Sequence, residues 1–172
     1  LLVGDPTHRP TRDDGYAAAH AALTGEPGTR SGSVGAGCGA TAGRLRGGFG
    51  QASMQVGEWV MAAGIVANPM GDVMNPDTGE FWADPRRKVA VDKLPAATPK
   101  LNTTIGVIAT NAPITKAQAK RLAMVAHDGI ARAIHPAHSP LDGDTLFCLS
   151  TGDGTGVDLE TMLSLSTHAA EI

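Results

Sequence analysis

The sequence contains few cysteines, few aromatic side chains and only a small excess of negative charge. Its 172 residues include two cysteines, Cys38 and Cys148, which cannot build a disulfide framework. Aromatic residues account for 3% of the chain and the formal net charge is −3, so the sequence offers neither stacking platforms for bases nor a basic surface. We therefore expect no nucleic-acid partner.

A long hydrophobic run is also missing. The longest apolar stretch, around Trp59 to Ala67, is much shorter than the ~20 residues that a membrane-spanning helix needs. The sequence shows no secretory signal, and two isolated cysteines suit a reducing compartment. We expect a cytoplasmic protein with no membrane partner. Because the chain starts at Leu1 without a methionine and stops at Ile172 inside an expected helix, we also expect further sequence at both ends.

The residues that are present indicate a folded domain of ordinary size. Apolar residues make up 42% and charged residues 18%, which is typical of a globular chain. A chain of this length can bury a substantial core. We expect residues 1–172 to form a single domain.

The first half of the chain predicts one helix and a strand. Thr11-Arg-Asp-Asp14 has the pattern of a capping box and predicts a helix that ends at Gly25. The glycine-rich segment from Gly32 to Gly50 is compatible with either a strand or a loop of unusual backbone angles. Residues 53–68 predict one buried strand. Residues 84–100, which are charged and rich in proline, predict a surface linker.

The second half alternates strands with helices. Thr103 to Thr110 is apolar and β-branched on both faces, so we expect both faces of this strand to be covered. Thr115-Lys-Ala-Gln118 is a second capping box, and it opens a helix that Pro136 ends. Residues 145–150 predict another strand and residues 159–172 another helix. This alternation predicts a mixed α/β fold of stacked sheet and helix layers.

Asn102-Thr103-Thr104, at the start of an expected strand, is a candidate catalytic site. A threonine at a new chain N-terminus carries a nucleophilic hydroxyl and an α-amino group whose pKa of roughly 7.7–8.0 suits a base near neutral pH. The amine forms only if the bond between Asn102 and Thr103 is cut, and the Thr103 hydroxyl can begin that cut by attacking the Asn102 carbonyl. Taken alone, a threonine at a strand start is more often without a catalytic role.

Several motifs in a fixed order make the tripeptide more informative. They are Val34-Gly-Ala-Gly-Cys-Gly-Ala-Thr-Ala-Gly, Val66-Ala-Asn-Pro-Met-Gly-Asp-Val, Asn102-Thr-Thr-Ile-Gly-Val-Ile-Ala-Thr-Asn-Ala, Lys116-Ala-Gln-Ala-Lys-Arg-Leu-Ala, Ala126-His-Asp-Gly-Ile-Ala-Arg-Ala-Ile-His-Pro-Ala-His and Asp142-Gly-Asp-Thr-Leu-Phe. Together they span most of residues 1–172. In these motifs the chain resembles the DmpA family of L-aminopeptidase/D-amidase-esterases, β-peptidyl aminopeptidases and endo-type nylon oligomer hydrolases.

The resemblance implies a four-layer αββα sandwich, made as a precursor that cleaves itself into two associated subunits. The cut would fall between Asn102 and Thr103, so residues 1–102 would be the C-terminal part of the α subunit. Residues 103–172 would form the β subunit, beginning at the nucleophile. The implied activity is hydrolysis of amide bonds in small peptides or amides, with 6-aminohexanoate oligomers as one option, through an acyl-Thr103 intermediate. The resemblance also implies a homo-oligomer of the α and β fragments.

The resemblance assigns roles to four side chains. Thr103 would be the nucleophile, and the Asn68 side chain would help to hold the oxyanion. Asp142 and Asp144 would contact the amino group of the nucleophile and orient it. Two carboxylates in one turn repel each other unless a cation lies between them, and an α-ammonium group at Thr103 would be such a cation. Without the resemblance, a solvated turn would be the simpler account of this pair.

One position departs from the resemblance. Nylon hydrolases have a lysine near the end of the glycine-rich segment, where this sequence has Arg44 and Arg46. An arginine stays charged, so Arg44 is a candidate for support of an oxyanion but not for moving a proton. The segments that would distinguish substrates are partly absent from the sequence, so its substrate stays open.

Cofactor and metal sites are the competing interpretations. Gly37-Cys-Gly39-Ala-Thr-Ala42 fits a loose dinucleotide-binding pattern, but no strand-to-helix unit surrounds it. His127, His135, His138 and Asp128 are metal-ligating residue types. Because His127 lies on an expected helix and the other two histidines flank Pro136 at its end, the sequence does not imply that they converge, and helix-end histidines are the simpler account. We expect neither a cofactor nor a metal.

Two other functions stay open. Ornithine acetyltransferase shares the fold type and self-cleavage, although it usually presents Thr-Met-Leu after the cut where this chain has Thr103-Thr-Ile. The other option is an uncleaved chain that serves as a non-catalytic structural subunit.

Overall fold

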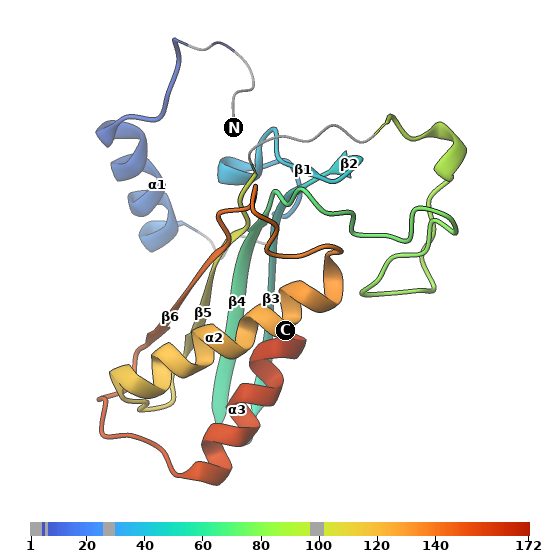
Figure 1. The fold of residues 1–172 in the computed structure, drawn as a ribbon. Coiled ribbons are helices and arrows are strands. Elements are labelled where there is room, and N and C mark those ends of the chain that lie inside the picture. Colours follow the sequence, from blue (N-terminus) through green and yellow to red (C-terminus); the bar gives the residue numbers. More distant parts are fainter. Residues whose placement is uncertain (1–4, 6, 26–29, 97–101) are drawn as a thin grey trace.

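The computed structural model describes residue 5 and residues 7–25, 30–96 and 102–172 (Figure 1). Its centre is a four-stranded sheet in the order β3-β4-β5-β6. Strands β3, β4 and β5 pair antiparallel, whereas β5 and β6 pair parallel and are joined through helix α2. Helix α3 lies beside α2 on the same face of the sheet (Figure 1). The bounds are β3 Gly48–Val56, β4 Trp59–Ala67, β5 Ile105–Thr110, α2 Lys116–Ala133, β6 Thr145–Ser150 and α3 Leu159–Glu171.

The prediction of one strand over residues 53–68 is wrong, because the segment folds back on itself. Strands β3 and β4 form a hairpin in which Val56 pairs with Trp59. Only Gly57 and Glu58 lie between them, and Gly57 takes a φ of 60°. A turn this short needs a positive φ, which glycine adopts without steric cost. The apolar residues on both sides of the turn conceal it in the sequence.

Of the two alternatives for residues 32–50, the loop describes most of the segment. It contains a short 3-10 helix, η1 (Gly35–Gly37), and two paired strands of two residues each, β1 (Thr41–Ala42) and β2 (Leu45–Arg46). Gly43 in the turn between them has a φ of 54°, and a side chain there would collide with Asp72. The segment becomes regular strand only where β3 begins.

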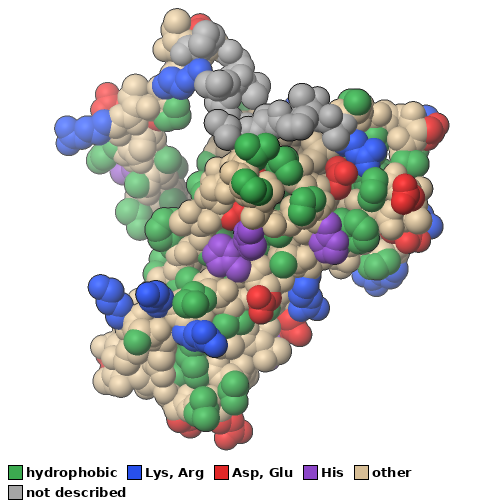
Figure 2. All heavy atoms as spheres, viewed as in Figure 1, with side chains coloured by type: hydrophobic (Ala, Val, Ile, Leu, Met, Phe, Trp, Pro, Cys, Tyr) green, Lys and Arg blue, Asp and Glu red, His purple; other side chains and the backbone are tan. Residues whose placement is uncertain are grey.

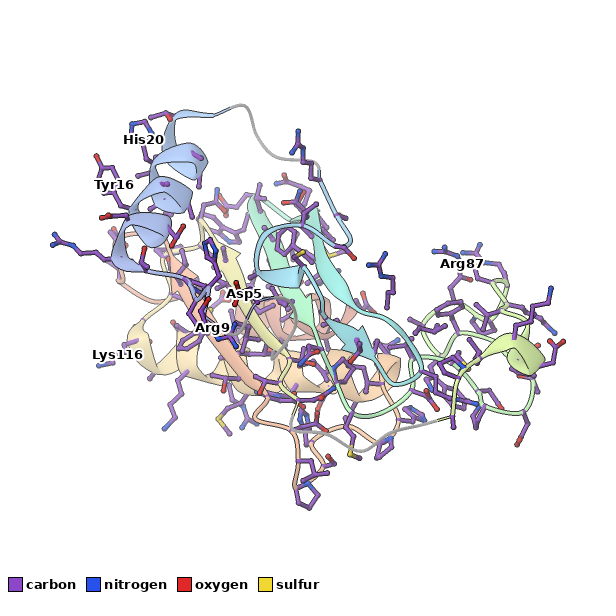
Figure 3. The ribbon with its side chains drawn as sticks, turned by 90° about the horizontal axis from the view of Figure 1, so that it is seen from above. Asp5, Arg9, Tyr16, His20, Arg87 and Lys116 are labelled. Atoms are coloured by element: carbon purple, nitrogen blue, oxygen red, sulfur yellow. The ribbon has the colours of Figure 1, made fainter. Side chains whose placement is uncertain are left out.

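Both predicted capping boxes are confirmed. Thr11 caps α1 (Arg12–Thr24) and Thr115 caps α2, each through reciprocal hydrogen bonds with the third residue of its helix. Helix α1 buries none of its residues and stands apart from the sheet (Figure 1). Tyr16 and His20 point away from the rest of the molecule (Figure 3). The predicted helix over residues 159–172 is α3, capped by the Asp158 side chain.

The core lies between the sheet and the pair of helices α2 and α3. Leu122 of α2 and Leu165 of α3 are fully buried, together with Met61 of β4 and Ile108 of β5. The core cluster contains Val56, Met61, Ala63, Ile108, Ala112, Ile114, Leu122, Ala126, Ile130, Ile134, Leu146, Leu165 and Ala169. The predicted mixed α/β fold is thereby confirmed.

The described residues cover one face of the sheet. On the opposite face Phe147 is 60% exposed, Leu149 48% and Ile105 42%. The expectation that both faces of β5 are covered is therefore met on the helix side alone within the described part of the chain. Of the four layers in the expected sandwich, the described residues supply one sheet layer and one helical layer.

The segment between β4 and β5 runs along the surface, as predicted for its described part. Residues 84–96 include the 3-10 helix η2 (Val91–Lys93) and bury no side chain. The rest of the predicted linker, residues 97–100, lies outside the described residues. Among the helices of the described residues, none combines the length and the apolar character needed to cross a membrane.

Leu122 provides a test of the core. Replacing Leu122 with Ala removes a fully buried side chain, so we expect the free energy of unfolding in urea to fall by about 3 kcal/mol. Met124 lies on the same helix and is 53% exposed, so Met124→Ala is the matched control and should change the stability by less than about 0.5 kcal/mol. Equal losses in the two variants would contradict this packing of α2.

Candidate active site

The predicted site residues meet at one edge of the sheet because of the strand directions. Strand β5 starts beside the start of its parallel neighbour β6 and beside the end of its antiparallel neighbour β4. The residues just before β5, just before β6 and just after β4 are therefore neighbours in space. They are Asn102–Thr104, Asp142–Asp144 and Asn68.

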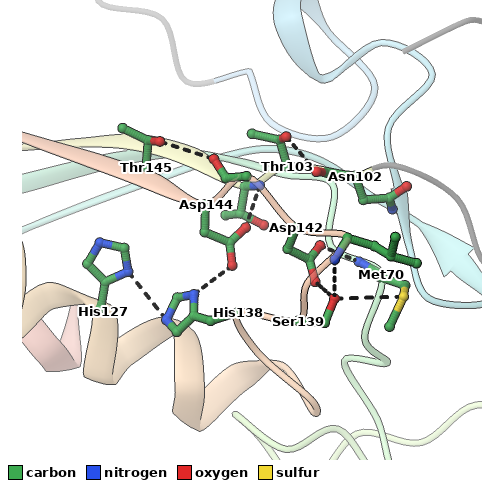
Figure 4. Close-up of polar contacts among 12 residues, drawn as sticks. Met70, Asn102, Thr103, His127, His138, Ser139, Asp142, Asp144 and Thr145 are labelled. Carbon is green, nitrogen blue, oxygen red and sulfur yellow. Dashed lines mark hydrogen bonds and ion pairs between the residues drawn. The ribbon is translucent and has the colours of Figure 1, made fainter.

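The carbonyl group of Asn102 lies at the centre of this edge (Figure 4). Its oxygen accepts a hydrogen bond from the Thr103 hydroxyl at 2.5 Å and another from the backbone N–H of Gly143 at 3.1 Å. A Cβ atom at Gly143 would lie 3.0 Å from the Thr103 Oγ1. The carbonyl thus has a hydroxyl beside it and a backbone donor on its oxygen.

Asn102 is held on both sides. Its side chain is buried and donates from Nδ2 to the Pro69 carbonyl at 2.8 Å, and its backbone N–H donates to the Leu141 carbonyl at 3.0 Å. Asn102 also forms a parallel bridge with Asp142, in the same register as the β5–β6 pairing that begins at Ile105 and Thr145. These contacts fix the peptide plane that precedes Thr103.

Asn68 contacts the site through its backbone and its side chain. Its carbonyl accepts the N–H of Thr103 at 3.0 Å. Its buried side chain accepts the N–H of Thr41 on Oδ1 at 3.0 Å. With the oxygen used as an acceptor, the NH₂ end of the amide is the donor that the predicted oxyanion role requires.

Asp142 and Asp144 lie beside the nucleophile, each with its own partners. Asp142 accepts from the backbone N–H of Met70 at 2.9 Å and from the Ser139 hydroxyl at 2.6 Å. Asp144 accepts the N–H of Thr104 at 2.8 Å. In the uncut chain neither carboxylate takes the N–H of Thr103, since Asn68 does. Their predicted contact with the free amine of a cut chain stays a prediction.

Sequence reasoning missed a contact between two histidines. His138 places Nδ1 2.7 Å from the second carboxylate oxygen of Asp144 and Nε2 3.3 Å from Nδ1 of His127. Burial and the neighbouring His138 lower the pKa of His127. The chain turns back after Pro136 and brings His138 against α2. Two histidines eleven residues apart give no sequence signal for this turn.

The third histidine does not join them. His135 stacks on Trp82 with ring centroids 4.5 Å apart. Within the ranges that the structure describes, no three or more His, Cys, Asp or Glu side chains are grouped as a metal ion would require.

Arg44 is paired with a carboxylate. Its guanidinium lies 3.3 Å from Asp72, and its backbone N–H donates to the same side chain at 3.1 Å. Both side chains are largely buried. The charge of Arg44 is therefore directed at Asp72, and its predicted support of an oxyanion stays a prediction. Arg46, the other arginine of the segment, is exposed.

The model of peptidase family S58 matches residues 3–171. The chain belongs to peptidase family S58. The family resemblance predicted from the sequence is therefore confirmed. An uncharacterized aminopeptidase of Mycobacterium leprae is 43% identical, and the match covers 88% of this chain and 47% of that protein. A 6-aminohexanoate-oligomer endohydrolase of Kocuria sp. is 32% identical with the same coverage of both chains.

Two solved structures of related proteins have the same fold. A β-aminopeptidase of Burkholderia sp. has a TM-score of 0.64 at 25% identity and covers 83% of this chain and 44% of its own. The L-aminopeptidase D-Ala-esterase/amidase of Ochrobactrum anthropi, a variant of the Ntn hydrolase fold, has the same TM-score and identity and covers 83% and 42%. This S58 chain spans about half the length of the curated relatives that it matches, at 47% of each.

Proposed function

We propose that this S58 chain carries the cleavage site and the nucleophile of a self-processing amide hydrolase. The observation that carries the proposal is the pair of donors on the Asn102 carbonyl, the Thr103 hydroxyl and the Gly143 N–H. A reacting hydroxyl needs to lie beside the carbonyl that it attacks, and a developing oxyanion needs a preorganised donor. Membership of a peptidase family supports the same activity.

Self-cleavage would proceed through an ester. The Thr103 oxygen attacks the Asn102 carbonyl carbon, and the Gly143 N–H stabilises the oxyanion. The C–N bond between Asn102 and Thr103 then breaks, and the hydroxyl proton passes to the leaving nitrogen. Water hydrolyses the ester, which leaves a carboxylate on Asn102 and a free amine and hydroxyl on Thr103. The products are the fragments 1–102 and 103–172, proposed to be parts of the α and β subunits.

The cut chain would then hydrolyse amides. The Thr103 amine accepts the hydroxyl proton as the hydroxyl attacks the substrate carbonyl and forms an acyl-Thr103 ester. The position of the amine follows from the uncut chain, where its nitrogen already faces the Asn68 carbonyl. The Asn68 amide would donate to the oxyanion. Asp142 and Asp144 would orient the amine, and Arg44 would add positive charge nearby.

Relatives suggest the class of substrate. Those at 32–44% identity are named aminopeptidases or 6-aminohexanoate-oligomer endohydrolases, so we propose small peptides or amides as substrates.

We propose a cytoplasmic location, which the two free cysteines, Cys38 and Cys148, support. The α and β fragments would stay associated and assemble as a homo-oligomer. The proposed reaction uses no cofactor, no nucleic acid and no membrane.

Replacement of Thr103 tests the cut and its nucleophile. Thr103→Ala removes the hydroxyl that donates to the Asn102 carbonyl, so the purified protein should stay as one chain in denaturing electrophoresis. Thr103→Ser keeps a hydroxyl and should still cleave. The wild type should give two bands with a new N-terminus at Thr103. Cleavage of Thr103→Ala at the wild-type rate would contradict the assignment.

Gly143 tests the space around the nucleophile. In Gly143→Ala the new Cβ would lie 3.0 Å from the Thr103 Oγ1 and push the hydroxyl from the carbonyl. We expect self-cleavage to slow by about tenfold, which corresponds to ~1.4 kcal/mol in the barrier. Gly50→Ala is the control, because a Cβ there meets nothing within 4 Å. An unchanged rate in Gly143→Ala would place the nucleophile elsewhere.

An assay of the cleaved protein separates hydrolysis from the two alternatives. We expect p-nitroaniline release from at least one of the L-, D- or β-amino acid p-nitroanilides, or cleavage of a 6-aminohexanoate oligomer, and no acyl transfer to ornithine. Transfer of an acetyl group to ornithine would instead favour the acetyltransferase. A protein that stays as one chain and turns over none of these compounds would favour a structural subunit.

A further inference from the structure

A line of hydrogen bonds runs from the start of β5 to the surface of α2, and the proposed reaction does not use its outer half. The Thr104 N–H donates to Asp144 at 2.8 Å, Asp144 faces His138 at 2.7 Å, and His138 faces His127 at 3.3 Å (Figure 4). Histidine side chains gather in the middle of the face that carries α2 and α3 (Figure 2). The line ends one residue from the nucleophile.

Because Asp144 is buried, the position of its carboxylate depends on the contact with His138. The Asp144 side chain is 4% exposed, and its two oxygens are used by Thr104 and His138. A buried carboxylate oxygen that loses its donor keeps the full cost of desolvation. Without His138 the carboxylate would turn toward water. That turn would weaken its hydrogen bond with the N–H of Thr104, at the start of β5.

The hydrogen bonds also restrict the protons on the two rings. Because a carboxylate accepts only, Nδ1 of His138 carries a hydrogen. The facing nitrogens of His138 and His127 can hold one proton between them, since two N–H groups would point at each other across 3.3 Å. Burial lowers the pKa of His127, which favours the neutral form of that ring. The other charged groups acting on His127 are Asp144, before β6, and Asp128, next to it on α2.

The backbone of His138 is held in an unfavourable conformation. Its φ is 54°, and it is the one residue other than glycine with a positive φ in the described part of the chain. A residue with a Cβ in this region is strained, and such positions persist when the surrounding structure holds them. The strain at His138 coincides with the contact that presents its ring to Asp144.

We infer that His138, backed by His127, is a positioning residue that fixes the Asp144 carboxylate and thereby aligns Thr103 with its target carbonyl. The inference rests on the proposed function of Thr103. The imidazole does not touch the reacting atoms. It acts through Asp144 and the N–H of Thr104, on both the self-cleavage and the later hydrolysis.

The test compares two replacements of His138 in the full-length protein. His138→Ala removes the donor to Asp144, and we expect about a 10- to 100-fold loss in the self-cleavage rate and in kcat, with KM changed by less than about twofold. His138→Asn keeps an N–H donor on a side chain that tolerates positive φ, so both rates should recover to within a few-fold of the wild type. His127→Leu should cause a smaller loss, because the bond between His138 and Asp144 remains.

The pH profile separates positioning from a purely structural role. The wild-type rates should change as His127 takes up a proton at a pH below the ordinary histidine range, and this step should disappear in His127→Leu. His20→Asn is the matched control, because His20 is exposed on α1 and its side chain hydrogen bonds to Thr24 of the same helix. It should leave the rates and the profile unchanged.

Each outcome decides one of the two proposals. Wild-type protein that neither cleaves nor hydrolyses contradicts the proposed function and the role of His138 with it. Wild-type rates in His138→Ala, or a loss that His138→Asn does not restore although both variants fold by circular dichroism, contradict the positioning role alone. If His138→Ala and His138→Asn both fail to fold, His138 is structural and the inference is again overturned.

Discussion

The parallel pairing of β5 with β6, beside the antiparallel pair of β4 and β5, is the constraint on which the site depends. It places the end of one strand and the starts of two others at a single edge of the sheet. Asn68, Asn102–Thr104 and Asp142–Asp144 therefore meet although up to 76 positions separate them in the sequence. Helices α2 and α3 support this edge indirectly, because they bury the face that holds the strands in register.

The contacts at this edge are largely made by the backbone. The carbonyls of Asn68 and Asn102 and the N–H groups of Thr103 and Gly143 are held by the sheet, so they need no reorganisation during a reaction. Side chains adjust this frame: Asp142 fixes the loop after β4 through the Met70 N–H. Because these polar groups are partly or fully buried, each hydrogen bond is electrostatically stronger than it would be in water.

Local signals predicted the helices well and the hairpin poorly. A capping box is a short pattern whose hydrogen bonds lie within four residues, so Thr115 alone located the start of α2. The turn at Gly57 depends on one positive φ between two apolar strands, and the apolar pattern of the sequence does not predict a turn there. The pair of His127 and His138 escaped prediction because it depends on the path of the chain beyond Pro136.

The sequence by itself determined the family, the strand and helix types of the second half and the identity of the candidate nucleophile, because these follow from ordered motifs and local patterns. Only the tertiary structure decided which donors reach the Asn102 carbonyl, that Arg44 pairs with Asp72, and that Asp144 contacts Thr104 and His138. The physical reason is that hydrogen bonds depend on distances of a few ångströms between groups far apart in the chain. Strand pairing and the paths of the loops set those distances together.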